Sequence, residues 1–167
     1  MTTDIMHNGM KLASLEPVTM GQAPDFILAD QNGDSVQLSK LMKPVILSVF
    51  PDLTHEVCSL QTKRFNTEAA LRPDFEFISI STNSAEQAKA WCAAAGSGHT
   101  MLSDDGSFGR AYGLILDEDD EDLELARAVY LIDENGKIIY SEIVENIGME
   151  ADYEALLSQL RRPSQIM

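Results

Sequence analysis

Two cysteines are the residues of this chain best suited to redox chemistry. Cys58 follows an apolar run, a proline and a short loop, so it is predicted to lie near the N-terminus of a helix. Unpaired backbone N–H groups and the positive end of the helix dipole favour a thiolate there. Cys92 falls within a second predicted helix, on its apolar side. These positions make Cys58 a candidate nucleophile, but they leave open that both cysteines are only small buried side chains.

The arrangement of the cysteines excludes two other kinds of site. The chain contains no Cys-x-x-Cys, which rules out an adjacent dithiol of the thioredoxin type. The histidines, His7, His55 and His99, are scattered and do not combine with the cysteines at metal-ligand spacing. We therefore expect neither a metal nor another cofactor.

The elements that position Cys58 follow from the pattern of apolar residues. Residues 45–50 form a continuous apolar run closed by Pro51, which is typical of a strand buried on both faces. A helical stripe then runs from Cys58 to Ala69, and Pro73 ends it. The sequence thus predicts a buried strand, a short loop and a helix that starts close to Cys58.

The same alternation positions Cys92. Residues 75–80 are predicted to form a second strand, and Ser-Ala-Glu-Gln at 84–87 is a capping box for the next helix. That helix carries Cys92 on its apolar side and ends at Gly96. A short segment near residues 100–103 follows.

The remaining elements complete an α/β order. They are a strand or hairpin arm at 10–15, a hairpin at 26–38 with its turn at Asn32-Gly33, a short helix at 108–112, a hairpin at 126–144 with Asn135-Gly136, and an amphipathic helix from Tyr153 to Leu160. Strands alternating with helices favour a central mixed β-sheet covered by helices in three layers. A βαβα half followed by a ββα half is the thioredoxin-like order, here with an N-terminal β-hairpin extension. We expect residues 1–167 to form a single domain.

The charge of the chain limits its partners. It has 27 acidic and 12 basic residues, a formal net charge of -15. This charge repels nucleic-acid backbones and anionic membrane surfaces, so we expect no nucleic-acid and no membrane partner. The start of the chain lacks the basic and apolar regions of a secretory signal, so a cytoplasmic location with reduced cysteines is expected. The acidic run at 117–122 is predicted to be a solvated loop.

Several stretches resemble the peroxiredoxins and, more narrowly, the bacterial thiol peroxidases, which are atypical two-cysteine peroxiredoxins. The apolar run, Pro51 and Cys58 match the peroxidatic-cysteine region, and Cys58 begins a Cys-x-x-x-x-x-x-Phe-Asn pattern. The separation of the two cysteines is also that of the family. Further matches are Ala-Trp-Cys-Ala-Ala-Ala-Gly at 90–96, Phe-Gly-Arg-Ala-Tyr-Gly at 108–113, Ala-Arg-Ala-Val-Tyr-Leu-Ile-Asp at 126–133 and Glu-Ala-Asp-Tyr-Glu-Ala at 150–155.

The resemblance implies a role for each matching residue. Cys58 would be the peroxidatic nucleophile and become a sulfenic acid. Pro51 would shield that acid, and Arg127 would lie beside Cys58 and favour its thiolate. Cys92 would resolve the sulfenic acid as an intramolecular disulfide, which thioredoxin or a similar dithiol would reduce. The family also implies a homodimer, to which the aromatic residues at 108–112 are expected to contribute.

One position departs from the family pattern. The family has a threonine three residues before the cysteine, where this chain has His55, and the nearest threonine is Thr54. Either side chain could supply the hydrogen bond of the family's hydroxyl. The departure keeps one alternative to a peroxidase open, a redox-sensing or binding protein that forms the disulfide slowly. A third possibility is a scaffold on the same fold without redox chemistry, for which the paired cysteine positions would be coincidence.

Overall fold

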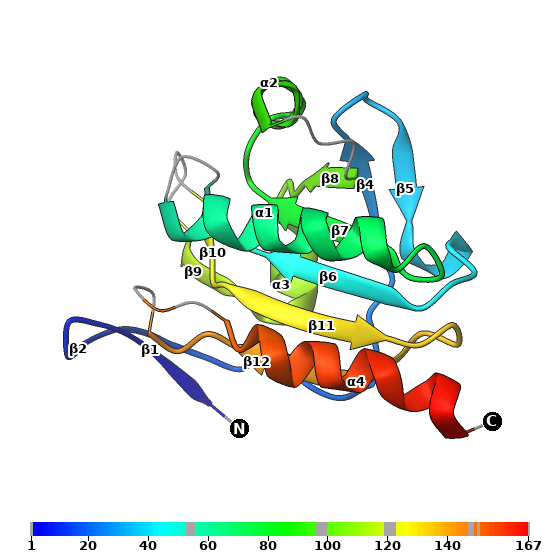
Figure 1. The fold of residues 1–167 in the computed structure, drawn as a ribbon. Helices are drawn as coiled ribbons and strands as arrows, with labels where there is room; N and C mark the ends of the chain where they lie inside the picture. Colours follow the sequence, from blue (N-terminus) through cyan, green and yellow to red (C-terminus); the bar gives the residue numbers. More distant parts are fainter. Residues whose placement is uncertain are drawn as a thin grey trace.

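A computed structural model describes residues 2–52, 56–95, 100–118, 123–146, 149 and 151–166. Within these residues, eight strands form one mixed sheet with helices on both faces (Figure 1). The strands of this sheet are β3 (Gly21–Gln22), β4 (Ile27–Asp30), β5 (Ser35–Gln37), β6 (Val45–Val49), β7 (Glu76–Ser81), β8 (Thr100–Ser103), β11 (Ala128–Ile132) and β12 (Lys137–Ile143). The helices are α1 (Glu56–Leu71), α2 (Ala85–Ala95), α3 (Ser107–Tyr112) and α4 (Tyr153–Ile166), with a 3-10 turn at Leu38–Lys40.

The order of the sheet is β3-β12-β11-β6-β7-β8-β4-β5, with β6 near its centre. β6, β7 and β8 run parallel, and the other neighbours are antiparallel. Two successive parallel crossovers in the same direction place their helices on one face when both are right-handed. The connections through α1 and α2 therefore bring both cysteine-bearing helices to the same side of the sheet. This arrangement confirms the predicted α/β fold with a thioredoxin-like order.

Alternating residues of the central strands pack into two apolar cores on opposite faces of the sheet. In β6, Val45, Leu47 and Val49 point into one core, and Ile46 points into the other. The second core lies beneath α1 and α4, which run side by side across the front of the sheet in Figure 1. All five residues of β6 are buried, as expected for a strand covered on both faces.

The aromatic residues of α3 lie inside the first core. Phe108 and Tyr112 are both fully buried, and their rings stack with centroids 4.3 Å apart. Phe26 packs edge-on against Phe108 at 5.4 Å. The expectation that these aromatics would be exposed without a partner subunit is therefore wrong, because the β4 strand and its flanking residues already cover them.

The predicted hairpin turns at Asn32-Gly33 and Asn135-Gly136 both form. Their backbone geometry differs from that of a tight two-residue turn. Only the glycines, Gly33 and Gly136, have positive φ, at 85° and 83°. The Asp30 carboxylate accepts hydrogen bonds from the N–H groups two and four residues later, at 2.8 and 3.0 Å, and Asp133 does the same. The repeated Asp-x-Asn-Gly sequence thus forms a type I turn followed by a glycine bulge.

Two small hairpins lie outside the main sheet. Residues 10–15 form β2 (Met10–Leu15), which pairs with β1 (Thr3–His7), so the N-terminal hairpin is confirmed. β9 (Ile115–Glu118) pairs with β10 (Leu123–Leu125), a hairpin that the sequence did not predict. The first two acids of the 117–122 run therefore belong to a strand rather than a loop, and residues 119–122 lie outside the described residues. Within the described ranges, no helix is long and apolar enough to cross a membrane.

The end of α3 generates a stability prediction. Gly113 has a φ of 67°, and a Cβ there would lie 2.3 Å from the backbone oxygen of Glu16. Gly33 also has positive φ, but a Cβ there would meet nothing within 4 Å. We expect Gly33→Ala to cost about 1 kcal/mol of unfolding free energy from backbone strain alone, and Gly113→Ala about 3 kcal/mol, because backbone must also move. Urea unfolding of both variants measures the difference, and equal losses would contradict the close approach.

Candidate active site

The two cysteines meet in one buried cluster, although the chain places them in different helices. Cys58 lies near the described start of α1 and is 2% exposed, and Cys92 lies in α2 and is 6% exposed. Phe50, Ala88 and Met101 complete the cluster, which we call the cysteine cluster, and Trp91 packs against it. Both cysteines are free thiols.

Local sequence signals determine where the two cysteine-bearing helices begin. The strand β6 runs into Phe50, and the chain then turns at Pro51 towards α1. At the start of α2 the predicted capping box is present. The Gln87 N–H donates to Ser84 Oγ at 3.1 Å, and the Ser84 N–H donates to Gln87 Oε1 at 3.0 Å.

Met101 fixes the thiol of Cys92. The Cys92 Sγ donates to Met101 Sδ at 3.2 Å, and Met101 is 1% exposed in β8. The Met101 N–H donates to Gln31 Oε1 at 3.0 Å, which ties this position to the β4–β5 turn. Sequence reasoning missed Met101, although the alternation of a strand at 100–103 would have placed it on the opposite face from Leu102.

Several groups with opposing effects surround Cys58. Burial raises the pKa of its thiol above the usual value, and the carboxylate of Asp52 adds to this. The backbone N–H of Asp52 and the positive charge of Arg127 act in the other direction. Burial outweighs them, so the closed, reduced site favours the thiol. The positive charge of Arg127 therefore lowers the pKa of Cys58 by less than burial raises it.

Arg127 is buried immediately before β11, with 4% of its surface exposed. Its Nη1 donates to Gln61 Oε1 at 3.4 Å, and its Nη2 donates to the carbonyl oxygens of Asn146, at 3.4 Å, and Met149. The buried charge therefore has hydrogen-bond partners from α1 and from the connection after β12. These partners hold the guanidinium near the end of β6, since Ala128, the next residue, pairs with Val49.

Gln61 is a site residue that the sequence analysis missed. It is fully buried one helical turn after Cys58, and its Nε2 donates to Ser48 Oγ at 2.7 Å. Its oxygen accepts from Arg127, so it links the central strand to the guanidinium. The available signal was its place on α1, three residues from Cys58 and thus on the same face.

The remaining predicted residues divide between described and undescribed parts of the chain. Pro51 is half-buried, and its carbonyl oxygen accepts a hydrogen bond from Thr82 Oγ1 at 3.1 Å. Thr54 and His55 lie outside the described residues. Among the residues that the structure describes, no three His, Cys, Asp or Glu side chains gather as metal ligands would.

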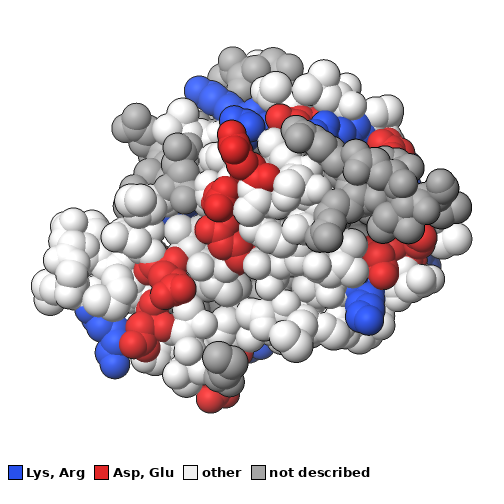
Figure 2. Space-filling view, turned by 60° about the horizontal axis from the view of Figure 1, so that its bottom comes forward, with Lys and Arg blue, Asp and Glu red and all other residues white. Residues whose placement is uncertain are grey.

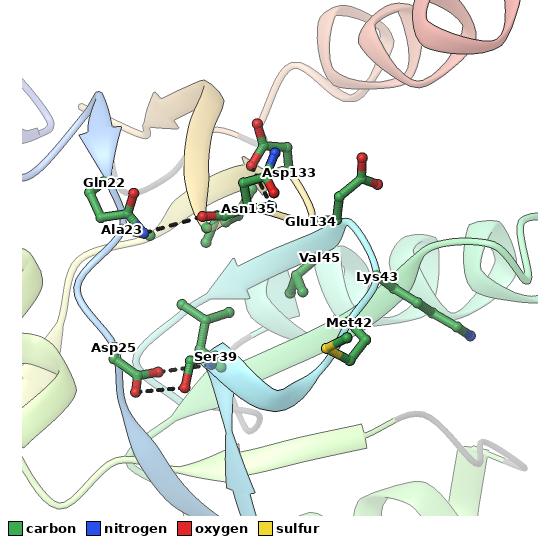
Figure 3. Close-up of a pocket in the computed structure, with 13 residues that line it drawn as sticks. Gln22, Ala23, Asp25, Ser39, Met42, Lys43, Val45, Asp133, Glu134 and Asn135 are labelled. Carbon is green, nitrogen blue, oxygen red and sulfur yellow. Dashed lines mark hydrogen bonds between the residues drawn. The ribbon is translucent and has the colours of Figure 1, made fainter.

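A separate small pocket lies at the other end of the central strand, and Figure 3 shows its lining. Val45, the first residue of β6, lines this pocket. Cys58 belongs to the helix that comes after Val49, the last residue of β6. Asp25 binds Ser39 on one side, and Gln22 reaches Asn135 at 3.4 Å on the other. The pocket contains neither cysteine and is therefore not part of the cysteine site.

Part of the chain's negative charge lies on one face of its surface. Figure 2 shows acidic side chains in a broken band across the face that turns forward from the bottom of Figure 1, with basic side chains towards its margin. The acidic side chains of this band disfavour anionic partners there.

Comparison with known proteins assigns the chain to a family. Residues 19–157 match the Redoxin family. The chain is 39% identical over 145 residues to a thiol peroxidase from Oceanobacillus iheyensis, covering 84% of this chain and 86% of that protein. It is 37% identical over 160 residues to a thiol peroxidase from Staphylococcus epidermidis, covering 93% and 94%.

Solved structures share the fold. A peroxiredoxin-like protein from Aquifex aeolicus superposes with a TM-score of 0.85 at 22% identity, covering 95% of each chain. A thiol peroxidase from Chromobacterium violaceum gives a TM-score of 0.83 at 17% identity, covering 99% of each chain. Together with the family match and the closer relatives, these findings show that the chain belongs to the Redoxin family and, within it, to the thiol peroxidases.

Proposed function

We propose that this chain reduces hydrogen peroxide and organic hydroperoxides with Cys58 as the peroxidatic nucleophile. The observation that carries the proposal is the convergence of Cys58, Cys92 and the charge of Arg127 at one buried site in a chain of this family. The Cys58 thiolate attacks one peroxide oxygen, and the O–O bond breaks. Cys58 becomes a sulfenic acid, and the other oxygen leaves as water or an alcohol.

Cys92 then resolves the sulfenic acid. Its sulfur attacks the Cys58 sulfur, water leaves, and an intramolecular disulfide forms. Thioredoxin or a similar dithiol donates the two electrons that return both thiols. Both sulfurs belong to helices and are packed in the cysteine cluster, so part of α1 or α2 must unwind before they bond. Cys92 stands only three residues before the end of α2, where opening costs least.

Pro51 and Arg127 support the nucleophile. Pro51 lies between β6 and α1 and shields the sulfenic acid from water. Arg127 stabilises the thiolate and the negative charge that develops on the leaving oxygen. Its buried guanidinium is held in place by Gln61, so it is oriented before peroxide arrives.

We further propose a cytoplasmic homodimer formed through the surface beside α3. The buried aromatics of α3 do not supply this surface, but Ile27 is 59% exposed and lines a hollow with Ser107. Light scattering of the reduced protein should give twice the mass of the 18.4 kDa chain. A monomeric mass at micromolar concentration would count against the dimer.

The peroxidase cycle is tested by cysteine variants. Cys58→Ser should abolish peroxide consumption with a thioredoxin system, and Cys92→Ser should consume about one equivalent of peroxide and then stop. Peptide mapping of oxidised parent protein should find one disulfide, between Cys58 and Cys92. Exclusively intermolecular links would contradict the cycle.

A redox sensor is the second candidate, and the raised pKa of Cys58 favours it because a thiol reacts more slowly than a thiolate. Stopped-flow oxidation separates the two functions. A disulfide that forms only slowly, without sustained peroxide turnover, would assign the sensor.

The charge of Arg127 generates a pH prediction. Loss of a cation beside a thiol removes a contribution that lowers its pKa, so Arg127→Met should raise the pKa of Cys58 further. The thiolate fraction at pH 7 should then fall by about tenfold or more, as one pKa unit corresponds to one decade. The pH dependence of thiolate absorbance in a Cys92→Ser background measures the shift, and Arg127→Lys should restore part of it. An unchanged profile would show that Arg127 does not act on Cys58.

The departure at His55 is tested by three substitutions. If Thr54 donates the hydrogen bond to the thiolate and peroxide, Thr54→Val should slow oxidation of Cys58 by about 10²–10³, and His55→Ala should be nearly silent. If His55 is the donor, the pattern reverses, the rate varies with pH near about 6.5, and His55→Thr keeps or raises it. Parent-like rates in all three variants would exclude both residues. We favour Thr54, because a small hydroxyl fits beside a peroxide in a tight pocket.

A further inference from the structure

A polar network joins the segment before Cys58 to the start of α2. Asn83 lies between β7 and α2 and is 7% exposed. Its Nδ2 donates to Asp52 Oδ1 at 3.0 Å and to Gln87 Oε1 at 3.3 Å. On the other side, Asn83 Oδ1 accepts a hydrogen bond from Ser81 Oγ at 3.1 Å. The backbone N–H of Asn83 donates to Ser81 Oγ at 3.2 Å. The amide is therefore fixed at both ends, with one N–H group directed at a carboxylate.

That carboxylate belongs to the residue whose backbone touches the sulfur of Cys58. The Asp52 N–H donates to Cys58, which favours the thiolate, whereas the Asp52 carboxylate opposes it. The net effect of Asp52 on the pKa of Cys58 therefore depends on how the backbone and side chain of Asp52 are oriented. A backbone N–H keeps its direction only if the segment that carries it is held.

The connection from β7 to α2 holds this segment at two points. Thr82 Oγ1 donates to the carbonyl oxygen of Pro51, and Asn83 binds the side chain of Asp52. The segment before the nucleophile is thus held by the turn that begins the helix of the other cysteine. Nothing in the spacing of Cys58 along the sequence points to this turn.

We propose that Asn83 is a positioning residue for Cys58: by holding the Asp52 carboxylate, its amide keeps the Asp52 N–H on the sulfur. This inference rests on the proposed function, in which Cys58 is the nucleophile. Asn83 touches neither substrate nor reacting atoms and acts only through Asp52. It also draws the negative charge of Asp52 into a hydrogen bond, which weakens the opposition of that charge to the thiolate.

The charged and titratable groups that face Cys58 set the design of the test. Among the residues that the structure describes, they are Asp52 before α1, Arg127 before β11 and Cys92 in α2. Replacing Cys92 by Ser removes the second thiol, and Arg127 stays in every variant. The readout is the pH profile of Cys58 alkylation by iodoacetamide, which requires no peroxide and no reductant.

Two variants should shift the profile in opposite directions. Asn83→Ala releases Asp52, so the midpoint should rise and alkylation at pH 7 should slow by about three- to tenfold, the range expected for one hydrogen bond. Asp52→Asn removes the opposing charge but keeps an oxygen for Asn83 and the backbone N–H. Its midpoint should therefore fall, and alkylation at pH 7 should be faster. Because Asp52→Asn is nearly isosteric, it keeps the proposal testable even if Asn83→Ala folds poorly.

Ser84→Ala is the matched control. It removes the side-chain cap of α2 next to Asn83 but leaves the contact with Asp52. It should lower the denaturation midpoint, as a lost cap does, without moving the pH profile of Cys58. Urea unfolding of all variants separates loss of stability from loss of positioning.

The outcomes are distinct. A parent-like profile in Asn83→Ala, or equal shifts in Asn83→Ala and Ser84→Ala, would overturn the positioning role. If the parent protein consumes peroxide and Asn83→Ala has a parent-like profile, only this inference fails. If the pH profiles of Asn83→Ala and Asp52→Asn shift as expected but the parent protein consumes no peroxide, the proposed function fails and the positioning of Cys58 stands.

Discussion

Burial of a thiol beside a buried positive charge is the constraint on which the rest of the site depends. A guanidinium that is 4% exposed must have its donors satisfied, because an uncompensated buried charge is strongly destabilising. Arg127 obtains its partners from α1 and from the connection after β12. The same hydrogen bonds therefore keep the charge next to the sulfur and hold the helix that carries Cys58 to the residue that precedes β11.

The burial of Cys58 has a cost for reactivity that oriented groups offset. Desolvation raises the thiol pKa, because burial reduces the solvation that stabilises a thiolate. What remains are a few fixed contributions, from Arg127 and from the N–H of Asp52. In a buried site each such group has a larger effect than it would in water, so their placement decides how readily the thiolate forms.

The two cysteines share a cluster without being free to react within it. Cys92 donates to Met101, and both side chains are almost completely buried. At the other end of the same helix, the capping box and Asn83 hold the first turn of α2 in place. In the proposed cycle the resolving step requires part of α1 or α2 to open, and Cys92 lies at the end of α2 away from the capping box.

The sequence by itself determined the elements and much of the candidate chemistry. The five-residue buried strand, the capping box and the two Asp-x-Asn-Gly turns are local signals, and each forms where the pattern predicts it. The order of strands and helices was enough for the thioredoxin-like fold, and the family motifs were enough to nominate both cysteines. Local rules work here because they depend on residues only a few positions apart.

Only the tertiary structure decided which distant residues meet. Gln61, Met101 and Asn83 are ordinary residues in sequence, and they join the site because parallel crossovers and sheet pairing bring α1, α2 and β8 together. The same packing buries Phe108 and Tyr112, which sequence reasoning had placed at a subunit surface. It also buries Cys58 deeply enough for desolvation to outweigh the charge beside it. Such effects depend on long-range contacts and on the exclusion of water, and neither is written in the spacing of residues along the chain.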